Sequence, residues 1–298
     1  MLLSIWPNAQ QPWNDLLEEV RHAEATGWHC AYVADHFMGD GGGFGAPEVP
    51  TLEATAVLAG LATATDRIGL APLVLGNTYR HPAVVAKWAA TVDHLSGGRL
   101  TLGIGAGWQR NEHEQYGITL PSPGERVARL DEACAVLRAM LHHPPATVAG
   151  EHYRVTDALC EPAPVQEHLP LLVGGKGDRM LGLVARHADH WNMWGLPEVL
   201  AERAGVLARR CEAVDRDPAT IHRSTQALVM LTDDPARGAS FVESVAPRAA
   251  FAGTADEFAA LCDDWAAVGI DEVIVPDAAL GTGAHRLERL DALRGAVR

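Results

Sequence analysis

Cysteine, lysine and long apolar runs are all scarce in this sequence of 298 residues. The five cysteines are odd in number and nowhere form a C-x-x-C pair, which argues against disulfides and zinc knuckles and favours reduced thiols. The sequence lacks any run of about 18 apolar residues, and its start, MLLSIWPNAQ, lacks a basic region before an apolar core. We therefore expect no membrane anchor and a cytoplasmic protein.

Positive charge is scarce as well, since 24 lysine and arginine residues face 38 acidic ones and the formal net charge is −14. Nucleic acids and anionic membranes require a positive surface, so we expect neither as the main partner. What the chain does have is an ordinary globular composition, with 48% hydrophobic and 21% charged residues. It can therefore bury a sizeable core, and extensive disorder is not expected.

Short apolar runs alternate with longer amphipathic segments along the whole chain. Eight runs read as strands: LLSIW (2–6), HCAYVA (29–34), IGLAPLVLG (68–76), RLTLGIGA (99–106), LPLLVGG (169–175), DHWNMW (189–194), IHRSTQALVML (221–231) and DEVIVP (271–276). Eight alternating repeats predict a parallel α/β fold, and they favour a closed (β/α)8 TIM barrel with insertions over an open doubly wound sheet. We expect one domain over residues 1–298, with residues 150–168 as a hairpin or excursion.

Functional residues of such a barrel follow the carboxyl ends of its strands. The second predicted strand is followed by Asp35 and His36, and this histidine can transfer a proton near neutral pH while the aspartate fixes its tautomer. The structural alternative is a turn-capping aspartate beside a partly buried histidine. We assign the next residue, Phe37, to the substrate pocket. The glycine-rich loop 39–45 is suited to a mobile cover over a ligand, or is a plain surface connection.

Small and polar residues follow the third and fourth predicted strands. Gly76, Asn77, Thr78 and Arg80 offer neutral donors and one cation for a polar ring edge or a phosphate, or else form an ordinary turn before the next helix. The fourth strand carries glycines in G-x-G-x-G spacing, which differs from the dinucleotide fingerprint. The missing side chains either open space for a flat ligand or allow tight barrel packing. The residues concerned are Gly103, Gly105 and Gly107, with Trp108, Asn111 and Glu112 at the rim.

The fifth predicted strand ends in VGGKGDR, where Gly174, Gly175 and Lys176 precede a helix. Backbone N–H groups at a helix start, together with the cations Lys176 and Arg179, form an anion site, although an ordinary turn would have the same sequence. The pattern is not a Walker loop. The histidines suggest no convergent ligand set. His142 and His143 follow a helix, and His187 and His190 straddle a helix end and a strand start. The cluster of Glu112, His113 and Glu114 is too tight in sequence for its side chains to converge on one metal ion, so we predict no metal site.

Several segments, in order, resemble the luciferase-like monooxygenase superfamily, and more narrowly its F420-dependent oxidoreductase branch. They are VADHF (33–37), the stretch from LEATAVLAG to NEHEQYGI (52–118), LPLLVGG (169–175) and ARHADHWN (185–192). The resemblance covers essentially the whole chain and is densest over 28–118. It implies a barrel that holds a flavin or 5-deazaflavin in its mouth, with coenzyme F420 favoured over FMN, and a homodimer.

The resemblance also implies roles for individual residues. His36 would stand near the reactive face of the ring as proton donor or acceptor, with Asp35 beside it. Gly76 and Asn77 match a bulge that often contains a non-prolyl cis peptide. Cofactor contacts, from the resemblance and the strand-end positions together, fall on Gly76, Asn77, Thr78, Gly105, Gly107, Asn111, Gly174, Gly175 and Lys176.

One departure from the family pattern concerns the substrate. Sugar-phosphate dehydrogenases of this branch carry a glutamate where this chain has Trp108, so sugar-phosphate dehydrogenase activity is not expected. The tryptophan instead favours an apolar or aromatic substrate that stacks near the cofactor ring. The leading hypothesis is F420-dependent hydride transfer to or from a small organic substrate. The alternatives are an FMN-dependent luciferase-like monooxygenase and a barrel that binds a cofactor without turnover.

Overall fold

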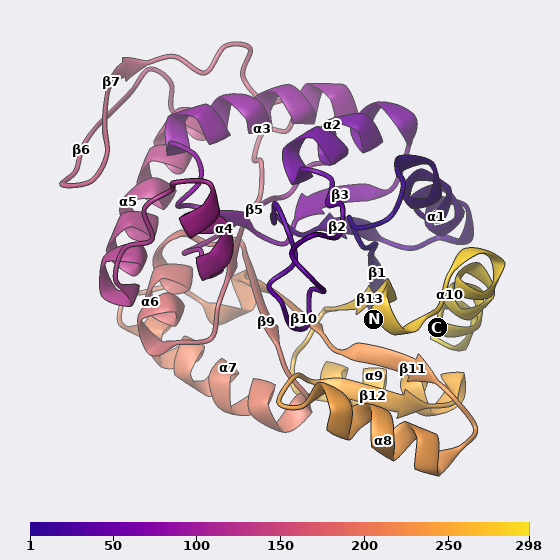
Figure 1. Cartoon of the computed structure of the whole chain (residues 1–298). Coiled ribbons are helices and arrows are strands. Elements are labelled where there is room, and N and C mark those ends of the chain that lie inside the picture. Colours follow the sequence, from indigo (N-terminus) through magenta and orange to yellow (C-terminus); the bar gives the residue numbers. More distant parts are fainter. Residues whose placement is uncertain (298) are drawn as a thin grey trace.

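The computed structural model describes residues 1–297, and its strands form a ring at the centre of the molecule with helices around them (Figure 1). The main sheet is parallel, in the order β3-β2-β1-β13-β10-β9-β8-β5-β4. Its strands are β1 (Leu2–Trp6), β2 (Cys30–Val33), β3 (Gly69–Pro72), β4 (Leu75–Gly76), β5 (Leu102–Gly105), β8 (Leu171–Gly174), β9 (His190–Trp194), β10 (His222–Gln226) and β13 (Glu272–Pro276). Leu70 in β3 also pairs with Leu100, which brings the two ends of the sheet together. The TIM barrel with insertions that the sequence predicted is confirmed.

Ten α-helices lie within residues 1–297, most of them in the outer ring (Figure 1). They are α1 (Trp13–Thr26), α2 (Ala54–Ala64), α3 (Pro82–Ser96), α4 (Arg110–Gln115), α5 (Pro123–His142), α6 (Asp178–His187), α7 (Pro197–Glu212), α8 (Pro235–Val245), α9 (Ala255–Ala267) and α10 (Gly283–Ala296). Local sequence fixes several ends: Thr254 and Glu257 form a capping box at the start of α9, and Gly27 ends α1 at a φ of 82°. Over these residues, none of the helices is both long and apolar enough to cross a membrane.

Two insertions form small sheets of their own. The expected excursion at 150–168 contains the second strand of an antiparallel hairpin, β6 (Ala146–Ala149) and β7 (Arg154–Ala158). The run 221–231 is not one strand, because only β10 belongs to the barrel. Its second half, β11 (Leu228–Leu231), pairs instead with β12 (Ala250–Gly253), which the apolar pattern did not reveal.

The third barrel strand is split by a bulge that shapes the mouth of the barrel. β3 and β4 are separated by Leu73 and Val74, whose peptide bond is cis, so the cis peptide lies before the Gly76–Asn77 position that the family resemblance implied. A Cβ at Gly103 would lie 2.1 Å from the carbonyl oxygen of Pro72. This glycine therefore serves close packing of β5 against the third strand rather than space for a ligand.

The barrel interior is apolar in its middle and polar towards its floor. Because side chains alternate along a strand, Leu3 and Ile5 face the helices while Ser4 and Trp6 face the interior. The interior apolar cluster comprises Trp6, Cys30, Tyr32, Ala71, Leu73, Leu172 and Ile274. It separates the strands' carboxyl ends, where the loops gather, from their amino ends, where Glu272 is buried.

Candidate active site

A cavity of about 540 Å³ opens at the carboxyl ends of the barrel strands. This volume lies within the range of about 300–1,000 Å³ that is usual for small-molecule and cofactor sites. Residues in or just after β2, β4, β5, β8 and β9 line it. Those that the sequence predicted for the site and that do line this cavity are Asp35, His36, Gly76, Gly105, Gly107, Trp108, Gly174, Gly175 and Lys176.

His36 is held by a buried carboxylate from a different part of the chain. Its Nδ1 lies 2.9 Å from Oε1 of Glu112 on α4, and the amide of Phe37 donates to Oε2 of the same carboxylate at 2.8 Å. The Tyr79 hydroxyl also donates to Oε1. Burial raises the pKa of Glu112, but the hydrogen bonds from His36, Tyr79 and the Phe37 amide outweigh it and lower this pKa below its usual value. A charged carboxylate can only accept, so Nδ1 carries the proton and Nε2 is the nitrogen left for a ligand.

Asp35 has a different task from the one that the sequence suggested. Its carboxylate binds Arg80 through two hydrogen bonds of 2.7 and 2.9 Å, and it accepts the amide of Gly76 at 2.8 Å. Arg80 also contacts Glu53 at 2.5 Å. Glu112, rather than Asp35, therefore fixes the tautomer of His36. The aspartate ties the end of β2 to the bulged third strand instead.

Aromatic rings surround His36 on the cavity side. The ring centroid of Phe44, from the glycine-rich loop, lies 5.0 Å from that of His36. The ring centroid of Trp108 lies 5.4 Å from that of His36, and these two rings meet edge to face. The ring centroid of Trp6 lies 6.2 Å from that of Phe44 and 5.7 Å from that of Trp194. The wall is thus suited to a flat or apolar ligand.

Phe37, which the sequence assigned to the substrate pocket, points away from this wall. It packs between Tyr79 and Tyr116, with ring centroids 4.7 and 4.8 Å away, and does not line the cavity. A strand's side chains alternate in direction, and the chain keeps this alternation just beyond β2. Phe37 therefore supports the shell around Glu112 rather than contacting a ligand in the cavity.

Asn77 and Thr78 lie in a separate hollow of about 270 Å³ beside the cavity, which Arg129 also lines. The Asn77 amide donates to the hydroxyl of Tyr153 at 3.2 Å, and the Thr78 hydroxyl lies 2.8 Å from Nε2 of His113. Neither residue lines the main cavity. Any contact that they make with a ligand would be with a part that extends beyond the cavity.

Asn111 anchors the glycine-rich loop. Its side chain donates to the carbonyl of Gly39 at 2.8 Å, and the neighbouring Gln109 donates to the carbonyl of Met38 at 3.0 Å. Both donors come from the start of α4, the helix that also carries Glu112. The loop that brings Phe44 to the cavity is therefore fixed to the same helix that orients His36.

The far side of the cavity is cationic. Lys176 lines it just before α6, and Arg126 lines it from α5. Nη1 of Arg126 donates to the carbonyl of Gly107 at 2.5 Å, whereas its Nε is buried and has no hydrogen-bond partner within residues 1–297. The backbone amide of Gly175 donates to the backbone carbonyl of Asn192 at 2.9 Å and is not free for an anion. Two cationic side chains, more than the glycine backbone, thus make this end suitable for a phosphate.

A smaller cavity of about 270 Å³ adjoins the first and shares Trp6, His36, Phe44 and Trp194 with it. Arg248 lines it, with its guanidinium 5.4 Å from the centre of the Phe44 ring. His36 therefore stands between a larger cavity with a cationic end and a smaller one with an aromatic wall. Molecules bound in the two cavities can therefore both contact the imidazole of His36.

Two of these residues, Arg126 and Arg248, were not predicted from the sequence, and the role of a third, Glu112, was not recognised. The sequence places Glu112 at the rim, whereas it is fully buried, because the exposure of an acid in E-H-E depends on tertiary contacts. Arg126 and Arg248 stood among many arginines with no motif around them. The only available signal was that α4 follows a barrel strand, where functional side chains gather.

The chain matches other proteins along most of its length. It is 33% identical to an uncharacterized protein of Mycobacterium tuberculosis, over 57% of this chain and 64% of the relative. An F420-dependent glucose-6-phosphate dehydrogenase of Beutenbergia cavernae is 35% identical over 59% of this chain and 51% of its own length. A pyrimidine monooxygenase of Stutzerimonas stutzeri is 30% identical over 73% of this chain and 61% of its own. The chain thus spans less than two thirds of each of these relatives.

Solved structures share the fold at lower identity. An F420-dependent secondary alcohol dehydrogenase in complex with an F420-acetone adduct superposes with a TM-score of 0.85 at 19% identity, covering 100% of this chain and 98% of that one. A long-chain alkane monooxygenase has a TM-score of 0.82 at 15% identity, over 100% and 92%. The family model described as luciferase-like monooxygenase matches residues 3–294. The protein is therefore a member of the luciferase-like monooxygenase family.

Proposed function

We propose that this protein is an oxidoreductase that binds coenzyme F420 in the larger cavity and transfers a hydride between it and a small organic substrate. His36 is the proton donor or acceptor. The observation that carries the proposal is the pair formed by His36 and the buried Glu112 between the two cavities. General acid–base groups need both a fixed orientation and a partner that stabilises the charged state, and Glu112 supplies both.

The lining of the larger cavity fits a flat ring with an anionic tail. The third strand's bulge and β5 form one wall, where Val74 packs so closely that a Cβ at Gly105 would lie 2.6 Å from its Cγ2. Lys176 and the Nε of Arg126, which has no hydrogen-bond partner within residues 1–297, are suited to the phosphate that both F420 and FMN carry. Trp108 and Phe44 would face the ring system from the rim.

When bound, F420 supplies a hydride donor or acceptor at the central ring. In the direction of reduction, Nε2 of His36 delivers a proton to the substrate atom next to the carbon that has received the hydride. In the direction of oxidation, the same nitrogen removes the hydroxyl proton of an alcohol. Glu112 stabilises the imidazolium in either case. The substrate gains or loses one hydride and one proton in total, so the step is balanced.

The smaller cavity is our candidate for the substrate site. Its walls include Trp6, Phe44 and Trp194, which favour an apolar or aromatic substrate, as the sequence also predicted from Trp108. Support for F420 over FMN comes from the F420-dependent relatives and from the sequence resemblance. The FMN-dependent monooxygenase is the alternative, since monooxygenases match this chain as well. We also propose a homodimer, a single domain and a cytoplasmic location on the resemblance and composition.

Cofactor binding is tested by titrating the purified protein with F420 and, separately, with FMN while following tryptophan fluorescence. Trp6, Trp108 and Trp194 line the larger cavity, so binding there changes their emission. We expect saturable binding with preference for F420. Preference for FMN, together with oxygen consumption by the reduced flavin complex, would instead establish the monooxygenase. Binding of F420 without turnover across a broad panel of alcohols, enones and imines would favour the non-catalytic barrel.

A further inference from the structure

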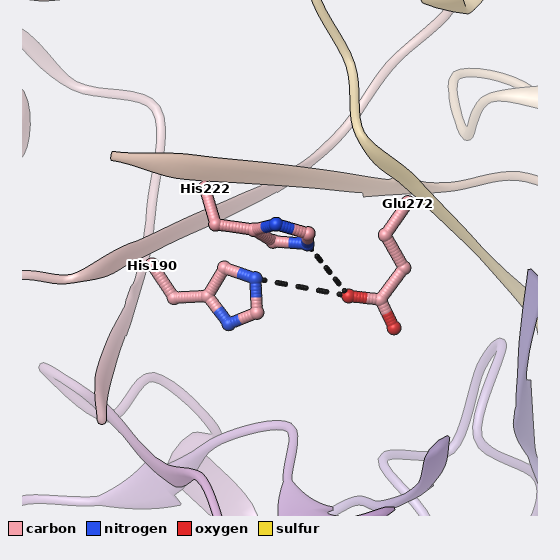
Figure 2. Close-up of side chains that lie close together, drawn as sticks. All are labelled: His190, His222 and Glu272. Carbon is pink, nitrogen blue, oxygen red and sulfur yellow. Dashed lines mark hydrogen bonds and ion pairs between the residues drawn. The ribbon is translucent and has the colours of Figure 1, made fainter. Parts of the chain in front are cut away.

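Three potential metal ligands meet at the floor of the barrel, at the end opposite to the candidate active site. His190, His222 and Glu272 stand at the amino ends of the neighbouring strands β9, β10 and β13. Figure 2 shows both imidazoles turned towards the carboxylate of Glu272. We refer to these three residues as the floor cluster. The prediction of no metal site did not consider these three residues together, since they lie far apart in the chain and become neighbours only when the barrel closes.

The spacing within the floor cluster matches that of zinc ligands. Nε2 of His222 lies 3.1 Å from Oε2 of Glu272, and Nε2 of His190 lies 3.7 Å from the same oxygen. One ligand atom from each residue lies within 4.8 Å of the others. Ligands about 2.0–2.2 Å from a tetrahedral zinc ion are about 3.4 Å from one another. The two measured distances lie on either side of this value.

One nitrogen of the cluster lacks a partner. Nε2 of His190 is buried and makes no hydrogen bond within residues 1–297. A buried polar atom in this state is costly unless something else satisfies it. The rings of His190 and His222 are also only 3.7 Å apart between centroids, so both imidazoles can reach a single ion. An ion bound here would satisfy the nitrogen that lacks a partner.

A second layer of residues holds the carboxylate in place. The hydroxyl of Ser4 donates to Oε1 of Glu272, and the hydroxyl of Tyr32 donates to Oε2 at 3.1 Å. On the other side, Nδ1 of His222 lies 3.8 Å from a carboxylate oxygen of Asp271. Metal-binding histidines and carboxylates in proteins usually have such outer partners, which orient them and fix the tautomer.

We propose that the floor cluster binds one divalent transition-metal ion of the zinc class. Two imidazoles and one carboxylate suit Zn²⁺, whereas Mg²⁺ and Ca²⁺ prefer oxygen ligands throughout. Metal binding replaces the hydrogen bond between His222 and Glu272, and the displaced proton moves to Nδ1 beside Asp271. The His222 side chain is 29% exposed, which leaves a route for the ion and for a water molecule as fourth ligand.

The position of the cluster indicates a structural role. The apolar interior of the barrel separates it from the cavity at the opposite strand ends. An ion here would link three adjacent strands, and it would stabilise the folded chain because the unfolded chain has no such site. Hydride transfer at His36 does not require it.

The direct test is calorimetric titration of chelator-treated full-length protein with Zn²⁺. We expect one ion per chain, with no competition from millimolar Mg²⁺. In His222→Gln and in Glu272→Gln the affinity should fall by about 100-fold or more, since the loss of even an outer partner typically costs 10- to 100-fold. His142→Gln is the matched control, because it removes a histidine from the separate stacked pair of His142 and His168 and should bind as the parent does.

A second measurement does not depend on the variants. In crystals of the unaltered protein grown with Zn²⁺, anomalous scattering should place the ion about 2.0–2.2 Å from ligand atoms of all three residues. Absence of Zn²⁺ binding would overturn the proposal. So would an ion at His142 and His168 alone, or equal affinity in the parent and in folded His222→Gln and Glu272→Gln.

Discussion

Oε1 of Glu112 lies 2.9 Å from Nδ1 of His36, although the two residues are 76 positions apart in the chain. The contact connects the loop after β2 to α4, which follows β5. Through Tyr79 the same carboxylate also reaches the segment after the bulged third strand. Three of the loops that shape the cavity are thus joined at one buried acid, and the imidazole is oriented by the closure of the barrel rather than by its neighbours in sequence.

His36→Ala should reduce turnover by about 10²-fold or more, because the proton donor or acceptor is lost. The affinity for F420, followed by tryptophan fluorescence, should change little, since Lys176 and Arg126 at the other end of the cavity are intact. His285→Ala, which changes a histidine exposed on α10, is the control. Equal turnover in His36→Ala and in the parent would remove this residue from the mechanism.

Glu112→Gln should reduce turnover by about 10-fold while leaving the fold intact, because an amide oxygen can still accept from Nδ1 but no longer stabilises the imidazolium by its charge. The KM and the affinity for F420 should stay close to those of the parent, because Glu112 does not itself line the larger cavity. A purely structural role for Glu112 would instead lower the melting temperature and weaken F420 binding together with turnover, and that result would contradict the assignment.

The barrel and the position of the site could be predicted from the sequence, whereas the partners within the site could not. The apolar runs 29–34 and 169–175 have the length and apolar content of buried strands, and functional side chains follow strand ends in such barrels. The acid that contacts His36 is determined by tertiary contacts. The prediction that the adjacent Asp35 fixes the tautomer of His36 is therefore wrong, because Glu112 makes this contact. The floor cluster was missed because its residues start strands that are distant in sequence.

Lys176→Ala should weaken the binding of F420 by about 10-fold or more, because a charge-assisted hydrogen bond contributes about 1.5–3 kcal/mol. The chain has one other lysine, Lys87, which donates to the carbonyl of Glu161 on the outside of the barrel. Lys87→Ala is therefore the matched control and should bind as the parent does. An unchanged dissociation constant for Lys176→Ala would place the phosphate at another part of the cavity.

Gly103→Ala should destabilise the protein by about 1–3 kcal/mol, as overpacking of a closed core does. The new Cβ would lie 2.1 Å from the backbone oxygen of Pro72, which cannot move aside without distorting the bulge. Gly295→Ala on α10 is the control, since its Cβ meets nothing within 4 Å and alanine favours the helix. Urea unfolding measures both changes, and equal stability of Gly103→Ala and the parent would show that β5 can shift freely.

Glu19 on α1 gives the stability a pH dependence whose sign is fixed by its surroundings. Burial and then the charge of Asp277 raise the pKa of Glu19 from 4.5 to about 8, although Arg286 contacts both carboxylates at 2.6 and 2.7 Å. A group with a raised pKa binds its proton more tightly in the folded chain than in the unfolded chain. Its contribution to stability is therefore complete below about pH 4.5 and is lost as the pH rises through about 8.

Glu19→Gln removes this titration, so its free energy of unfolding should fall less than that of the parent between about pH 5.5 and 8.5, by on the order of 2 kcal/mol. Urea unfolding at the two pH values measures the difference. Glu18→Gln, at the exposed neighbouring position, should keep the parent's pH dependence. If Glu19→Gln and the parent lost stability in parallel, the buried carboxyl would not be protonated in the folded chain, and the Arg286 ion pair would then outweigh burial at this position.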